Sequence, residues 1–181
     1  MDSIAIPQML LIAGTGRNTG KTTFACDILR KFSNVHSIVS LKITPHFHKN
    51  VQSGQVIVSS ENLCIAEETD TATGKDSSLM LQAGARKSYF VMASDAYLEF
   101  VWKTVSRLIP PGSLIICESG GLRSYLKPGL FFMMRSLEAE TIKPAAEKLK
   151  LMADRVITFD GEKIDFDLNS IEITGNRWKL K

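Results

Sequence analysis

Short apolar runs recur along the chain and alternate with segments whose apolar residues follow a helical period. The run at residues 8–13 is continuous and apolar, which is typical of a strand buried on both faces of a parallel sheet. Further runs predict strands at residues 37–43, 55–58, 63–67, 88–93, 113–117, 130–134 and 155–159. The pattern thus predicts a central sheet with several internal strands.

Helical spacing is clearest just after the first strand. Residues 22–32 place Phe24, Ala25, Ile28, Leu29 and Phe32 on one helical face. Further helices are predicted at residues 77–83, at 95–108 between an N-cap at Ser94 and the pair Pro110-Pro111, and at 143–152 with Pro144 in the first turn. Strands that alternate with helices predict an α/β fold, in which helices flank a mostly parallel central sheet.

The C-terminal tail follows a different period. Ile171 and Ile173 alternate with polar residues, a Gly175-Asn176 turn follows, and Trp178 resumes the alternation. This pattern predicts a β-hairpin that extends the sheet edge or covers one end of it. No internal repeat and no Pro-, Gly- or Ser-rich linker divides the chain, so residues 1–181 are expected to form a single domain.

Composition and charge change this picture little. The 181 residues are 44% hydrophobic and 23% charged, and the net charge of +3 is too small to indicate nucleic-acid binding. The three cysteines lack CxxC spacing and are expected to be reduced core residues. No stretch reaches the length of a transmembrane helix and the first residues lack a basic signal-peptide head. We therefore expect a cytoplasmic protein without membrane or nucleic-acid partners.

The segment GTGRNTGKTT, which follows the first strand, carries the strongest chemical signal. Glycines permit a tight turn with inward-facing backbone N–H groups, Lys21 supplies charge to phosphates, and the Thr22 hydroxyl can ligate Mg²⁺. A flexible turn with a lysine at the helix start is the alternative. The residues expected to bind nucleotide are Gly14, Thr15, Gly16, Asn18, Thr19, Gly20, Lys21, Thr22 and Thr23.

Three charged residues are candidate companions of this loop. Glu118 ends a predicted strand, where a carboxylate could hold Mg²⁺, or it faces solvent at an ordinary strand end. Asp76 is a second candidate metal ligand or a helix N-cap. Lys42 closes the second predicted strand, as an anion-binding lysine or as one that snorkels to water.

Other polar residues have less specific patterns. His46 and His48 lie in a predicted surface loop and give only a weak metal signal. Arg123 and Lys127 follow Gly121 and could meet an anionic substrate or be solvated.

Together the segments GTGRNTGKTT, LKITPHFH, GKDSSLMLQAGARKSYFV and SLIICESGG resemble the molybdopterin-guanine dinucleotide biosynthesis protein B group. The resemblance covers roughly residues 8–160 and implies the P-loop NTPase fold, with binding of GTP or ATP together with Mg²⁺ and slow hydrolysis. It also implies frequent dimerisation and assistance to the enzyme that attaches GMP to molybdopterin. By this analogy Lys21 and Thr22 contact phosphate and Mg²⁺, Glu118 and Asp76 hold the metal, and Lys42 faces the phosphates or the substrate.

The spacing of the loop also resembles a second family. Five residues separate Gly14 from Gly20, one more than in the usual phosphate-binding loop, and dethiobiotin synthetase has a loop lengthened in the same way. In that family an acidic residue stands where this chain has Gly16. The resemblance implies an ATP-dependent ligase, in which the lysine corresponding to Lys42 contacts a diamino acid. A non-catalytic nucleotide-sensing module is the third hypothesis, and the sequence leaves ATP and GTP equally open.

Overall fold

The computed structural model describes residues 3–47, 54–137 and 144–181. The helices are α1 (Lys21–Phe32), α2 (Asp76–Gln82), α3 (Leu98–Val105) and α4 (Pro144–Lys150). The strands are β1 (Ile4–Gly14), β2 (Ile38–Thr44), β3 (Gln55–Ser60), β4 (Leu63–Glu68), β5 (Lys87–Ala93), β6 (Leu114–Glu118), β7 (Leu126–Ser136), β8 (Arg155–Phe159), β9 (Ile171–Ile173) and β10 (Trp178–Leu180).

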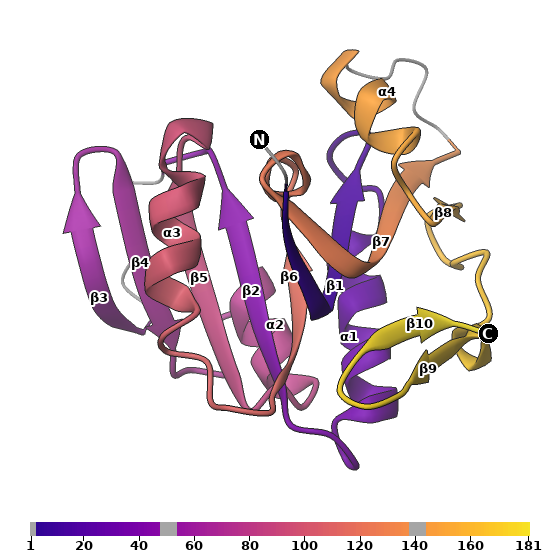
Figure 1. Cartoon of the computed structure of the whole chain (residues 1–181), viewed down its shortest axis with the longest axis horizontal. Coiled ribbons are helices and arrows are strands. Elements are labelled where there is room, and N and C mark those ends of the chain that lie inside the picture. The colour runs from indigo at the N-terminus through magenta and orange to yellow at the C-terminus, as the bar shows by residue number, and fades with distance from the viewer. Residues whose placement is uncertain (1–2, 48–53, 138–143) are drawn as a thin grey trace.

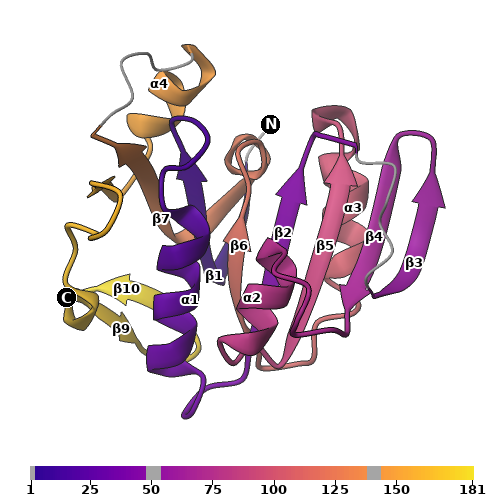
Figure 2. The same cartoon turned by 180° about the vertical axis from the view of Figure 1, so that it is seen from behind.

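Within the described residues the strands form an eight-stranded sheet in the order β3-β4-β5-β2-β6-β1-β7-β8. The neighbours from β5 to β8 run parallel, whereas β3 and β4 form an antiparallel hairpin at one edge. Helix α3 covers one face of the sheet (Figure 1), and α1 and α2 cover the other (Figure 2). The prediction of an α/β fold with a mostly parallel sheet flanked by helices is confirmed.

Alternation along the strands builds a separate apolar layer on each face of the sheet. In β1, Leu11 packs into the layer under α3 and Leu10 into the layer under α1, and both are fully buried. The predicted inner face of α1 supplies Phe24, Ile28 and Leu29 to the second layer. Burial on both faces explains why the internal strands have apolar runs rather than strict alternation. The three cysteines are buried free thiols, as expected.

Two strands are longer than the pattern predicted. Strand β1 begins at Ile4 and β7 at Leu126, and they pair with a shift of register between Ile6 and Leu10. Pro7 lies at this shift, and proline is tolerated at such irregularities because it cannot donate a ladder hydrogen bond. The proline interrupts the apolar run and hid the first part of the strand.

The predicted helix at residues 95–108 was wrong at both ends. Residues Asp95–Tyr97 form a 3₁₀ turn, and α3 begins only at Leu98. Ser94 takes the predicted N-cap position, but before the 3₁₀ turn and not before α3, and its side chain makes no capping hydrogen bond. After Val105 the backbone turns tightly, because the Leu108 N–H donates to the Val105 carbonyl three residues back. The helix thus ends before the proline pair is reached.

The C-terminal hairpin is present as predicted, with β9 and β10 antiparallel. Gly175 and Asn176 both have positive φ, of 53° and 61°, as a two-residue type I′ turn requires. The hairpin forms a sheet of its own and does not extend the edge of the large one. Trp178 is 1% exposed and meets Phe32 of α1 edge to face, with ring centroids 5.7 Å apart. The hairpin therefore covers the apolar layer beside α1 (Figure 2).

In the part of the chain that the structure describes, no helix has the length and apolar character needed to cross a membrane.

Candidate functional site

A cleft of about 450 Å³ opens at the carboxyl ends of the central strands, beside the N-terminus of α1. It is lined by Arg17, Asn18, Thr19, Gly20, Lys21, Thr22, Thr23, Lys42, Asp76, Glu118 and Phe159. Strand β6 lies between β1 and β2, and Lys42 pairs in register with Glu118. The parallel register therefore brings side chains from distant parts of the chain to one edge, where open α/β sheets bind ligands.

Lys21 is folded back onto the glycine loop. Its Nζ donates to the Gly16 carbonyl at 2.9 Å and to Thr19 Oγ1 at 3.0 Å. A β-carbon at position 14 would lie 2.5 Å from Thr19 Oγ1 and 2.9 Å from Lys21 Nζ. Gly14 thus leaves room for the lysine beneath the loop, although it does not line the cleft itself.

The backbone of the loop is rich in unused donors. The Thr15 N–H donates to the Met134 carbonyl at 2.9 Å, and the Phe24 N–H begins the helical ladder by donating to Gly20. Between them, the N–H groups of residues 16–23 donate to no acceptor among the described residues. Free N–H groups at a helix N-terminus favour an anion, because the helix dipole adds to their partial charge.

Gly20 fixes the entry into α1. It has φ of +76°, and a β-carbon there would lie 2.7 Å from the Phe159 ring. Phe159, at the end of β8, closes one side of the cleft and was missed by the sequence analysis. Its position at a strand end was the available signal, but nothing in the sequence pairs it with residue 20.

Replacing Gly20 by alanine should destabilise the fold by at least about 1–2 kcal/mol, because an L-residue is strained at positive φ and its methyl group would also meet Phe159. Gly16→Ala is the matched control, since a β-carbon there has no neighbour within 4 Å. Urea unfolding of both variants measures the difference. Equal stability of the two variants would contradict this description of the loop.

Glu118 lies at the centre of a polar network on the other side of the cleft. It is only 2% exposed, so the alternative of a solvent-facing strand end is wrong. The Thr22 hydroxyl donates to its Oε2 at 2.9 Å, and the Lys42 ammonium contacts its Oε1. The same ammonium is 2.7 Å from Asp76 Oδ2. Lys42 therefore bridges two carboxylates, and its charge does not snorkel to water.

Asp76 joins this network from the first residue of α2. The N-cap position belongs to Lys75, so the alternative of Asp76 as a helix N-cap is wrong.

Burial lowers the pKa of Lys21 and the nearby Lys42 charge lowers it further, although Glu118 and Asp76 act in the opposite direction. Burial would also lower the pKa of Lys42, but the attraction of Glu118 and Asp76 outweighs it and raises that pKa. Lys42 thus holds its proton more tightly than a free lysine.

The remaining candidates lie outside this network. Thr15 is buried behind the loop, and His46 is exposed and does not line the cleft. His48 is outside the described residues. Arg123 donates to the Leu126 carbonyl at 3.2 Å and lies over the Phe131 ring, while Lys127 is exposed. Among the described residues no group of three or more His, Cys, Asp or Glu side chains is placed to hold a metal ion, and the network around Glu118 contributes only two carboxylates.

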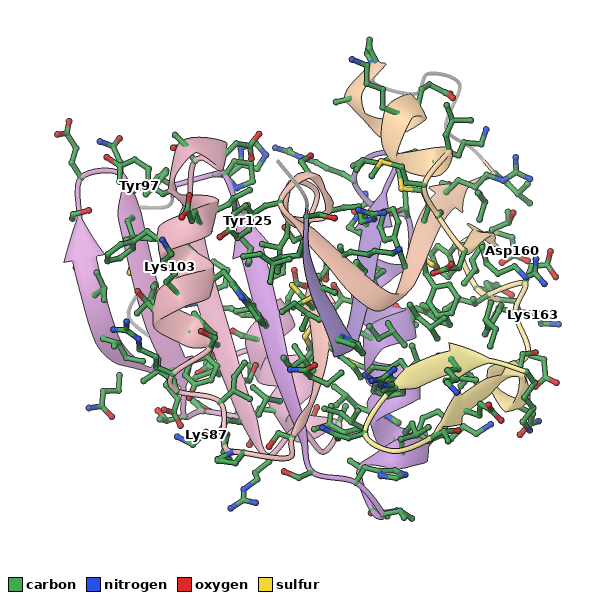
Figure 3. All side chains as sticks on the ribbon, viewed as in Figure 1. Lys87, Tyr97, Lys103, Tyr125, Asp160 and Lys163 are labelled. Atoms are coloured by element: carbon green, nitrogen blue, oxygen red, sulfur yellow. The ribbon has the colours of Figure 1, made fainter. Side chains whose placement is uncertain are left out.

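Asp160 follows Phe159 but does not line the cleft. Its Oδ1 accepts hydrogen bonds from the backbone N–H groups of Lys163 at 2.6 Å and Glu162 at 2.8 Å, and these bonds lower its pKa. Asp160 and Lys163 lie together in the turn beyond β8 (Figure 3). The carboxylate thus stabilises this turn.

No protein-family model, no curated protein and no solved structure matches the chain. Its function therefore has to be inferred from the chemistry of the cleft.

Proposed function

We propose that the chain is a P-loop protein that binds a nucleoside triphosphate, ATP or GTP, together with Mg²⁺ and hydrolyses it slowly. The observation that carries this proposal is the run of unpaired N–H groups at residues 16–23, which surrounds Lys21 at the start of α1. Such a run supplies many donors to one polyanion without any side-chain rearrangement. The flexible-turn alternative explains neither the partial burial of Lys21 nor its position beneath the loop.

The opposite wall of the cleft suits a hard divalent cation. Thr22, Glu118 and Asp76 offer only oxygen atoms, which Mg²⁺ prefers, and phosphate oxygens and water would complete its octahedron. The Lys42 ammonium already lies between the two carboxylates and acts as a stand-in cation there. Thr22, Glu118 and Asp76 are therefore the residues proposed to hold Mg²⁺. When bound, Mg²⁺ would neutralise charge on the terminal phosphates.

The chain's own residues would stabilise the transferring phosphoryl group mainly by position and charge. Lys21 has a resting position on Gly16 and Thr19, and it would exchange these neutral acceptors for phosphate oxygens. The N–H groups of residues 16–23 would fix the phosphate chain. Phe159 beside Gly20 would exclude water from one side of the cleft.

The physiological role is proposed from the family resemblance. A chain of this kind would assist the enzyme that attaches GMP to molybdopterin, and it would act as a homodimer. A ligase resembling dethiobiotin synthetase is the second candidate, because Lys42 projects into the same cleft as the phosphate loop. There it could meet the anionic group of a second substrate next to the terminal phosphate. A non-catalytic nucleotide-sensing module remains the third candidate.

Phosphate release distinguishes the three candidates. With Mg²⁺ and either ATP or GTP, we expect slow turnover that diaminopelargonate and bicarbonate do not change. Strong stimulation by those two compounds with ATP alone would favour the ligase. Nucleotide binding without any release would favour the sensing module, and absence of binding would contradict the proposed function.

A further inference from the structure

Lys42 occupies the position that a metal ion would need. Its ammonium is 2.7 Å from Asp76 Oδ2 and also contacts Glu118 Oε1. The side chain of Lys42 is 15% exposed and that of Glu118 is 2% exposed, so the pair is poorly screened by water. A side chain of the protein itself thus offsets one of the two negative charges of the carboxylate pair.

Two cations cannot share this position. Mg²⁺ binds oxygen at about 2.0–2.1 Å and tolerates little distortion of its octahedron. A metal ion held between Asp76 and Glu118 would lie where the ammonium now lies, and the two positive charges would repel strongly in a partly buried cleft. Direct metal binding by both carboxylates therefore requires the ammonium to leave.

We propose that Lys42 is an internal counter-ion that competes with the divalent cation for the Glu118–Asp76 carboxylate pair. The proposal rests on the proposed function in placing the metal at these carboxylates. Metal alone binds weakly, because it must displace a paired ammonium into a cleft whose described lining offers the ammonium no other anion. A metal–triphosphate complex supplies that anion through its phosphate oxygens. Lys42 thereby makes the site selective for metal that arrives with nucleotide over free metal.

Removing the counter-ion should strengthen the binding of free metal. We expect Lys42→Met to bind Mg²⁺ alone, in calorimetry without nucleotide, at least about tenfold more tightly than the wild-type chain. In the variant the metal no longer has to break the charged hydrogen bonds of the ammonium, and one such bond corresponds to about tenfold in affinity. Lys42→Arg should retain weak, wild-type-like binding because it keeps the charge.

Lys21→Met is the matched control. It removes one positive charge from the same cleft, but the Lys21 ammonium donates to Gly16 and Thr19 and to neither carboxylate. Its effect on Mg²⁺ affinity should be clearly smaller than that of Lys42→Met. Equal effects of the two substitutions, or no Mg²⁺ binding by Lys42→Met, would overturn the proposal.

Lys42→Met leaves the buried Glu118 without its ion pair and could destabilise the fold. Thermal unfolding detects such a defect. Added Mg²⁺ should raise the unfolding midpoint of Lys42→Met more than that of the wild-type chain, and an equal rise would count against the proposal.

Titration of the wild-type chain with Mg²⁺ and ATP or GTP separates the counter-ion role from the proposed function. If the variant binds Mg²⁺ more tightly but the wild type binds no nucleotide, only the proposed function is contradicted. If the wild type binds nucleotide but Lys42→Met does not bind Mg²⁺ more tightly, only the counter-ion role is contradicted.

Discussion

Replacing Lys21 by alanine should weaken the binding of ATP and GTP about a hundredfold, because it removes a half-buried charge that would pair with the terminal phosphates. The ammonium lies beneath the loop, held by the Gly16 carbonyl and the Thr19 hydroxyl. No other described residue of the loop supplies a comparably shielded positive charge, since Lys21 is half-buried and Arg17 is exposed. Calorimetric titration of both nucleotides in the presence of Mg²⁺ measures the loss.

Arg30→Ala is the control for Lys21→Ala. Arg30 lies on the same helix but on its exposed side, where it pairs with Asp27 at 2.8 Å. Exposed pairs of this kind contribute little, so nucleotide affinity should stay at the wild-type value. Nucleotide binding that survives intact in Lys21→Ala would remove the basis for a phosphate site at this loop.

Glu118→Gln should abolish the Mg²⁺ dependence of phosphate release and lower its rate about a hundredfold. Glutamine keeps the size of the side chain but lacks the negative charge that a hard cation requires. The substitution also removes the ionic acceptor of Thr22 and of Lys42. Release rates measured across a range of Mg²⁺ concentrations test both parts of the prediction.

The control for this second variant is Glu99→Gln. Glu99 forms an exposed i,i+4 pair with Lys103 on α3, away from the cleft. It should leave the rate and the metal response unchanged. Thermal unfolding shows whether Glu118→Gln is folded, and a folded variant with wild-type Mg²⁺ dependence would rule out Glu118 as a metal ligand.

The sequence predicted the fold class because the spacing of apolar residues reflects which faces of each strand and helix are buried. Runs buried on both faces indicated the internal strands, and the helical spacing from Phe24 to Phe32 indicated α1. Boundaries were less predictable. Pro7 hid the first part of β1, and apolar spacing beyond Val105 continued the helical pattern although the backbone leaves the helix there.

The members of the candidate site were mostly predictable from local signals, but the contacts between its distant members were not. Gly14 to Thr23 run from the end of β1 through a loop into α1, so their neighbourhood could be predicted from spacing alone. The network of Lys42, Asp76 and Glu118 depends on strand register and on the placement of α2, which no local pattern encodes. Asp76 was therefore left between metal ligand and helix cap, and the contact of Phe159 with Gly20 was not foreseen.

The central claim is that a triphosphate docks on the backbone N–H groups at the start of α1, and amide NMR tests it most directly. A ¹H–¹⁵N titration with Mg²⁺ and a non-hydrolysable analogue of ATP or GTP should shift the amide signals of residues 16–23 most strongly, because these donors have no partner among the described residues. The buried amide of Thr15, which already donates to Met134, should move less. Saturable binding that leaves the signals of residues 16–23 in place, or the absence of any binding, would contradict the account.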